Sequence, residues 1–192
     1  MNLFKRLLLA CAVLAAGTAT LSARPGGGGG LLYSLQRPDW NPAFLPEASG
    51  SGSIGQFGGY GYGVDREGFI TGGFGLVMFD AGASYQAAAP ASRVGGGFGG
   101  MIVGRRLSGG PLLNLDLAAR LGVGGFRPGA ATSYFSYYAE PYLELGVGLT
   151  PWMHLGVNVG YQLVGNLLPA APGSAFGFHA PSLGFTLTWG RY

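Results

Sequence analysis

Residues 112–125, LLNLDLAARLGVGG, alternate between apolar and polar or small side chains with almost no error. Side chains leave a β-strand on opposite faces with a period of two, so the stretch is predicted to be a strand with one apolar face. A soluble sandwich would turn that face to a core, whereas a membrane barrel would turn it to lipid. The face consists of Leu113, Leu115, Leu117, Ala119, Leu121 and Val123.

The same alternation recurs along the chain and predicts an all-β, antiparallel, up-and-down barrel of about eight strands. Tight connections at 108–111 and 150–152 alternate with longer ones at 127–133 and 165–181, the asymmetry typical of outer-membrane barrels. The clear strands are 112–125, 134–149, 153–164 and 182–190, and the weaker, glycine-rich ones are 53–64, 68–79, 83–89 and 95–107.

The N-terminus is typical of an export signal. Lys5 and Arg6 precede an apolar run over 7–16 and then small residues, with cleavage expected after Ala19 or Ala23. We therefore divide the chain into a signal peptide at 1–23, an irregular Gly/Pro/Ser-rich extension at 24–51 and a barrel at 52–192. The glycines at 26–30 are interpreted as flexible linker.

Composition supports a membrane barrel. Charged residues make up 10% of the chain, well below the quarter usual in soluble domains, yet no stretch after the signal is long and apolar enough for a membrane helix. Cys11 and Lys5, the only cysteine and lysine, leave with the signal, so the net charge falls from +3 to about +1. This balance argues against nucleic acid as a partner. Leu8 to Cys11 resembles a lipoprotein acylation box, but the apolar run continues past Cys11, which favours cleavage beyond it.

The charged residues decide which face of 112–125 would meet lipid. An arginine at the middle of a membrane costs about 2–4 kcal/mol, so Asp116 and Arg120 are predicted to face the lumen. With neighbouring strands they form a polar inner wall, in which Arg120 pairs with Glu140 or Asp116 and closes the barrel as a plug. The predicted wall consists of Asn114, Asp116, Arg120, Glu140, Glu144, His154, Asn158 and Gln162.

Aromatic residues near the strand ends predict two interfacial belts. Trp152 and Trp189 lie beside the short connections, and Phe126, Phe135 and Tyr137 lie at the opposite ends of their strands. Amphipathic rings prefer the membrane–water boundary, so each group is expected to mark one interface.

These patterns resemble the small exported barrels of the OmpA-like and OmpX-like kind over residues 52–192. The resemblance implies eight tilted strands, short periplasmic turns, longer extracellular loops and a location in the outer membrane. The C-terminal FTLTWGRY is similar to the signal that the barrel-assembly machinery of such bacteria reads, although Tyr192 is out of parity with Trp189. The implied partners are outer-membrane lipid and that machinery. Separately, the long loop 165–181 offers a place for an extracellular ligand, although the sequence does not choose between such binding, adhesion and envelope integrity.

The residues do not favour an enzyme, a cofactor or a metal site. Glu140 and Glu144 would be roughly 13 Å apart on a strand, too far for paired glycosidase carboxylates. The spacing of His154 and His179 does not suit a metal. Two alternatives stay open: a soluble exported β-sandwich that binds or adheres, and, more remotely, a lipid-modifying hydrolase in which His179 activates Ser182.

Overall fold

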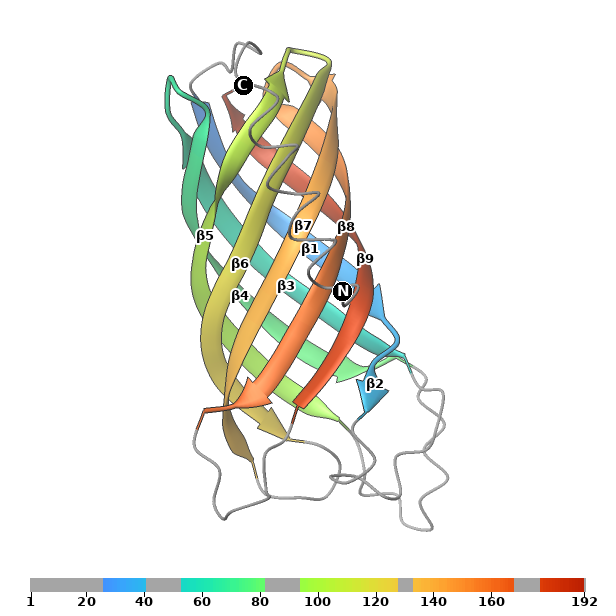
Figure 1. The fold of residues 1–192 in the computed structure, drawn as a ribbon. Coiled ribbons are helices and arrows are strands. Elements are labelled where there is room, and N and C mark those ends of the chain that lie inside the picture. Colours follow the sequence, from blue (N-terminus) through green and yellow to red (C-terminus); the bar gives the residue numbers. More distant parts are fainter. Residues whose placement is uncertain (1–25, 41–52, 82–93, 128–132, 168–176, 192) are drawn as a thin grey trace, which may run out of the picture.

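The computed structural model describes residues 26–40, 53–81, 94–127, 133–167 and 177–191, and all of their regular structure is β-strand. The strands twist around a common axis to form a tall barrel (Figure 1). Their bounds are β1 Gly26–Gln36, β2 Asp39–Trp40, β3 Ile54–Val64, β4 Phe69–Asp80, β5 Gly95–Gly109, β6 Leu113–Arg127, β7 Tyr134–Thr150, β8 Met153–Asn166 and β9 Gly177–Arg191.

A single antiparallel sheet closes on itself. Each long strand pairs with the next along the chain, and β1 pairs with β9 from Gly27 opposite Arg191 to Gln36 opposite Ser182. The two-residue β2 only extends the edge of β9, so eight strands form the wall. The predicted up-and-down antiparallel barrel is confirmed, and the sandwich alternative is wrong because there is one closed sheet rather than two packed sheets.

The two ends of the barrel differ. At the short-turn end, the connections at 65–68, 110–112 and 151–152 join consecutive strands, and the start of β1 lies beside the end of β9. Gly68 has a φ of 85°, which a residue with a side chain rarely adopts, in a turn that the Asp65 carboxylate closes by accepting from the Phe69 amide at 2.8 Å. At the opposite, loop end the connections are longer, as the sequence predicted.

The pentaglycine belongs to the barrel wall, so the prediction of an irregular extension is wrong for residues 26–36. β1 pairs with β3 on one side and β9 on the other. A Cβ at Gly28 or Gly30 would collide with backbone carbonyls of β9, so these inward glycines permit the tight approach that closure requires. The wall has eight strands, as predicted, but β1 is one of them in place of the predicted strand 83–89, which lies outside the described residues. The predicted loop 165–181 is also shorter, since β8 extends to Asn166 and β9 begins at Gly177.

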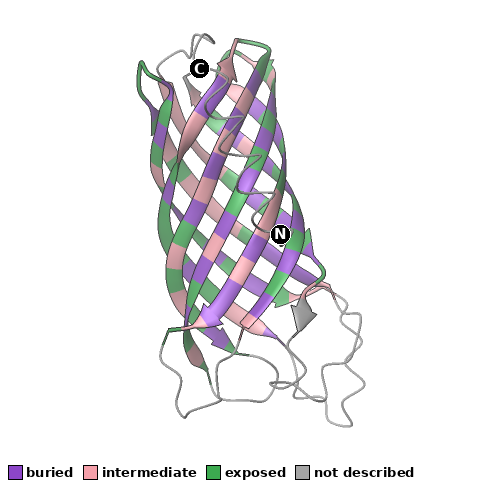
Figure 2. Cartoon of the chain, in the orientation of Figure 1, coloured by how far each residue is buried: buried purple, intermediate pink, exposed green. Residues whose placement is uncertain are grey.

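Burial alternates along the strands, and the stripes run around the whole wall (Figure 2). In β6 the predicted apolar row faces outward, with Leu113, Leu121 and Val123 about half exposed, while Asp116 and Arg120 face inward and are buried. The outer surface of the described residues carries 27 exposed large hydrophobic side chains.

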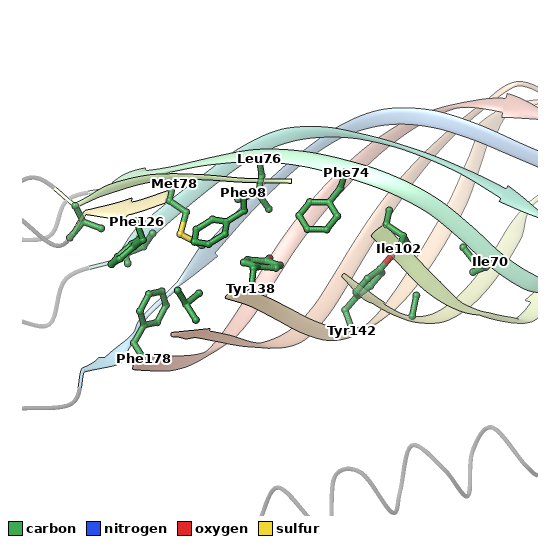
Figure 3. Close-up of a cluster of buried hydrophobic side chains, with 14 of the residues drawn as sticks. Ile70, Phe74, Leu76, Met78, Phe98, Ile102, Phe126, Tyr138, Tyr142 and Phe178 are labelled. Atoms are coloured by element: carbon green, nitrogen blue, oxygen red, sulfur yellow. The ribbon is translucent and has the colours of Figure 1, made fainter. Parts of the chain in front are cut away.

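The interior has two unlike walls. Strands β3, β4 and β5 contribute apolar side chains, which join Phe126, Tyr138 and Phe178 in one buried cluster (Figure 3). Buried polar side chains come mainly from β6 to β9 and β1. The polar side chains expected to fill the lumen therefore line one wall, and apolar side chains line the other. Phe126, predicted at a membrane interface, is 0% exposed and points inward because it shares the parity of Asp116 and Arg120.

Candidate functional site

The eight residues predicted to form a polar inner wall all face the interior, and none is more than 6% exposed. They come from β6, β7 and β8, whose antiparallel pairing aligns them in rows. Arg120 lies opposite Glu140, Asp116 opposite Glu144, and Glu144 opposite Asn158. The candidate site is this wall together with the groups that bond to it.

Glu140 is the centre of the densest group of hydrogen bonds, which we call the Glu140 cluster: Arg120, Tyr138, Glu140 and Ser182. Its Oε2 accepts from Arg120 Nη1 at 2.8 Å and from Tyr138 Oη at 2.6 Å, and its Oε1 accepts from Ser182 Oγ at 2.6 Å. Carboxylate and guanidinium are both essentially inaccessible to solvent, at 0% and 1% of their side chains. A buried charge is tolerated only when it is paired and hydrogen-bonded, and Glu140 meets both conditions.

Arg120 is held by a second contact. Its guanidinium carbon lies 4.0 Å from the centre of the Tyr142 ring, a cation–π geometry. Tyr142 follows Glu140 on the inward face of β7, so one strand supplies both the counter-charge and the ring. The cluster therefore fixes β6, β7 and β9 relative to one another.

A second buried ion pair lies closer to the short-turn end. Arg106 Nε and Nη2 donate to the two oxygens of Asp116 at 2.8 and 2.9 Å, a bidentate geometry. Asn114 and Tyr62 also contact this pair, at 3.4 Å each. Asp116 thus pairs with Arg106 and not with Arg120. Of the two partners predicted for Arg120, the structure shows Glu140.

Sequence reasoning missed Arg106 because its strand does not alternate cleanly. A register shift lies between Arg106 and Ser108, and Arg106 and Leu107 are both buried. The sequence did contain one indication of an inward arginine on this strand. Consecutive residues point to opposite faces, so one of the two adjacent arginines, 105 or 106, had to face inward. Arg105 faces outward, 5.7 Å from the Phe69 ring.

Strands β1, β3 and β9 add polar groups that the sequence pattern did not identify. Ser34 donates to Gln56 at 2.9 Å, and the Tyr60 and Thr188 hydroxyls lie 2.5 Å apart. The glycine-rich β1 and β3 gave little periodic signal, so their inward polar residues could not be identified.

Several buried amides of the inner wall make no side-chain hydrogen bond within the structure. Both polar atoms of Asn158 and of Gln162 lack a partner, as do both polar atoms of Gln36 and the Nε of Arg120. Leaving buried donors and acceptors unpaired is unfavourable. These groups therefore have hydrogen-bonding capacity that the described part of the chain does not use.

Aromatic side chains occupy the interior toward the loop end, and we call them the aromatic plug: Phe74, Phe98, Phe126, Tyr138 and Phe178 (Figure 3). Phe126 and Phe178 have ring centres 5.5 Å apart, and Tyr138 lies 5.4 Å from Phe98 and 5.6 Å from Phe74. The plug contacts the Glu140 cluster through Tyr138, so an apolar layer covers the polar wall on the loop side.

On the outer surface, the other four predicted interfacial aromatics are exposed near the two ends. Phe135 and Tyr137 lie near the loop end at 53% and 42% exposure, and Trp152 and Trp189 lie near the short-turn end at 56% and 38%. Their placement matches that predicted from the sequence.

The catalytic pair of the hydrolase alternative does not form. His179 is exposed on the outer face, where its Nδ1 lies 2.7 Å from the Tyr161 hydroxyl, whereas Ser182 is buried and donates to Glu140. The two residues are three positions apart on β9, so they have opposite parity and point to opposite sides of the wall. Among the described residues there is no group of three or more potential ligands arranged to hold a metal ion.

The comparison with protein families finds no family model that matches the chain, and the comparison with curated proteins finds no match either. In the described part of the chain no helix is long and apolar enough to cross a membrane.

Proposed function

We propose that the chain is an exported outer-membrane β-barrel with a closed interior, whose role is structural or surface-binding and not enzymatic. The carrying observation is the outer surface of the barrel, where apolar side chains face outward on every long strand. Apolar patches of this extent are unusual on soluble monomers and mark surfaces that meet lipid or other proteins.

The distribution of charge on the outer surface supports insertion in lipid. Among outward-facing strand residues with described side chains, charged groups are restricted to Arg105, toward the short-turn end, and Arg127, at the loop end. A charged side chain on the outer surface midway between the two ends of the barrel would cost about 2–4 kcal/mol at the membrane centre. This cost explains why the outer surface of the described strands lacks such residues there. The exposed aromatics near both ends fit two membrane interfaces.

The interior supports a closed barrel in preference to a pore. An eight-stranded barrel has an interior just wide enough for side chains, and here the Glu140 cluster and the aromatic plug occupy it. In the proposed orientation the short-turn end faces the periplasm and the longer connections face outside, where they bind a surface ligand. The proposal includes cleavage of the signal at 1–23 and insertion by the barrel-assembly machinery, and it needs no cofactor.

Fractionation of cells that express the full chain tests this proposal. We expect the protein in the outer-membrane fraction, released by detergent but not by salt or alkaline washing. A folded barrel should also migrate differently on a denaturing gel before and after boiling. Recovery from the soluble periplasm without detergent would show that the apolar surface is covered in some other way and would refute membrane insertion.

A further inference from the structure

The ladder of backbone pairs between β7 and β8 is interrupted at one place. Ala139 pairs with Leu163 and the next pair is Tyr142 with Gly160, with no change of register between them. Glu140 and Pro141 therefore lie opposite Gln162 and Tyr161 without forming ladder pairs. Proline has no amide hydrogen to donate, and the pairing of Pro141 with Ala119 on its other side is intact. The amide hydrogen that Pro141 lacks would therefore have pointed toward β8, and the pairing with β8 is the one that is interrupted.

A second interruption lies two strands away. The β1–β9 pairing ends at Gln36 opposite Ser182, and β2 resumes only at His179. Pro181 and Ala180 lie in this gap, opposite Arg37 and Pro38, with which they form no ladder pairs, and Pro181 pairs with Tyr161 across β8 and β9. Around Tyr161 and Pro181, β8 and β9 are paired with each other, but β8 is not paired with β7 and β9 is not paired with β1. Prolines are rare in central strands, so two at one level are a local weakness in the wall.

Unpaired polar groups lie directly behind this weakness. Gln162, next to Tyr161, is 0% exposed, and Gln36, opposite Ser182, is 2% exposed. Neither side-chain amide has a hydrogen-bond partner among the residues that the structure describes. Glu140 and Ser182 lie beside them but are already bonded to each other. Two independent features, broken ladders and unused buried amides, therefore coincide.

The outer side of the weakness faces the apolar surface. Pro141 and Pro181 are exposed there, and the hydrogen-bonded pair of Tyr161 and His179 adjoins them. On the inner face, Phe178 of the aromatic plug lies one inward position closer to the loop end than Gln162, and Arg120, stacked on Tyr142, lies toward the other end. Gln162 is thus flanked by other side chains along the barrel axis.

We propose that this interruption is a lateral portal, through which the polar head of a membrane lipid reaches the amides of Gln162 and Gln36. Side-chain amides both donate and accept, so they suit a neutral head that carries hydroxyl and carbonyl groups. Among the buried groups here, the Glu140 carboxylate is paired with Arg120, so the inner side offers no unpaired charge to an ionic head, and the exposed Arg37, in register opposite Pro181, lies on the outer side. The proposal rests on the proposed membrane insertion, and the test separates the two.

The test uses single cysteines in a Cys11→Ser chain reconstituted in phosphatidylcholine vesicles. Gln162→Cys lies behind the portal, and Asn158→Cys is an equally buried control on the same face of β8, opposite Glu144 in intact ladder. Leu145→Cys, on the outer face, reports contact with lipid. Each variant is treated with N-hexadecylmaleimide dissolved in the membrane, and separately with a charged, water-soluble maleimide.

We expect the lipid-soluble reagent to label Gln162→Cys at least tenfold faster than Asn158→Cys. Adding Pro141→Ala restores the missing donor and should slow labelling of Gln162→Cys several-fold without affecting Leu145→Cys. Adding 1-palmitoylglycerol should also slow it, whereas hexadecane, which lacks a polar head, should not.

Equal labelling of the two buried cysteines, or no effect of Pro141→Ala, would overturn the portal. If only the water-soluble reagent labelled Gln162→Cys, the site would be reached from water and not from lipid, and the portal would be refuted. If hexadecane slowed the labelling as much as 1-palmitoylglycerol does, recognition of the polar head would be refuted. Failure of the lipid-soluble reagent to label Leu145→Cys would instead refute membrane insertion. Each folded variant is identified by its altered migration before boiling.

Discussion

Replacing Glu140 by glutamine tests whether the Glu140 cluster holds the barrel together. The substitution preserves shape and an acceptor for Tyr138 or Ser182, but it leaves the Arg120 guanidinium, 1% exposed, without its counter-charge. Removing one partner of a buried ion pair typically costs 3–5 kcal/mol, because the remaining charge cannot reach water. We therefore expect Glu140→Gln to lower the free energy of unfolding by about 3–5 kcal/mol.

Glu144→Gln is the matched control. Glu144 has the same parity on β7 and is also buried, but neither of the two buried ion pairs in the described part of the chain includes it. Its neutralisation leaves no cation without a partner, so a cost under about 1 kcal/mol is expected. Urea unfolding in lipid vesicles, followed by tryptophan fluorescence, measures both. Similar costs for Glu140→Gln and Glu144→Gln would refute the assignment of Glu140 as the stabilising carboxylate.

Three further predictions concern the wall and the plug. Gly124→Ala should destabilise by about 1–3 kcal/mol in the same unfolding assay, because its Cβ would collide with the Gly97 carbonyl, whereas Gly125→Ala, which points into open space, should be nearly neutral; equal costs would contradict the packing. In planar bilayers the wild-type chain should show no conductance of porin size, while Phe126→Ala with Phe178→Ala should raise whatever leak is measured; a large wild-type conductance would exclude a closed interior. Leu121→Arg should cost about 2–4 kcal/mol in vesicles if its outward position is within lipid, and a negligible cost would argue against it.

The sequence predicted the second half of the barrel well because each strand there has one apolar and one polar face. In β6 to β8 the period of two shows that each segment is a strand and which residues share a face. Asp116, Glu140 and Asn158 could therefore be placed on one inner wall from the sequence alone. The same rule, applied strictly, would have placed Phe126 inside; its assignment to an interface relied on its place near a strand end and disregarded its parity.

The first half could not be predicted as far, since glycine leaves no periodic record. β1 begins with five glycines, which are compatible with linker or strand until both neighbours are known. Its closure against β9 is a long-range pairing that no local pattern reports. The partner of Asp116 depended on a register irregularity after Arg106, which alternation cannot reveal. The apolar inner wall was missed for a similar reason, because Phe74 and Phe98 are isolated among glycines.

The central claim is that the apolar face meets lipid while the polar face is enclosed, and a nitroxide scan along β6 tests it most directly. Spin labels are introduced one at a time in vesicle-embedded protein, and collision with oxygen, which partitions into lipid, is compared with collision with a water-soluble nickel chelate. We predict high oxygen and low nickel accessibility at the outward positions and low values for both at inward Ala118 and Gly122. High nickel accessibility along the outward row would show that it faces water and would contradict the account. The outward positions are Leu115, Leu117, Ala119, Leu121 and Val123.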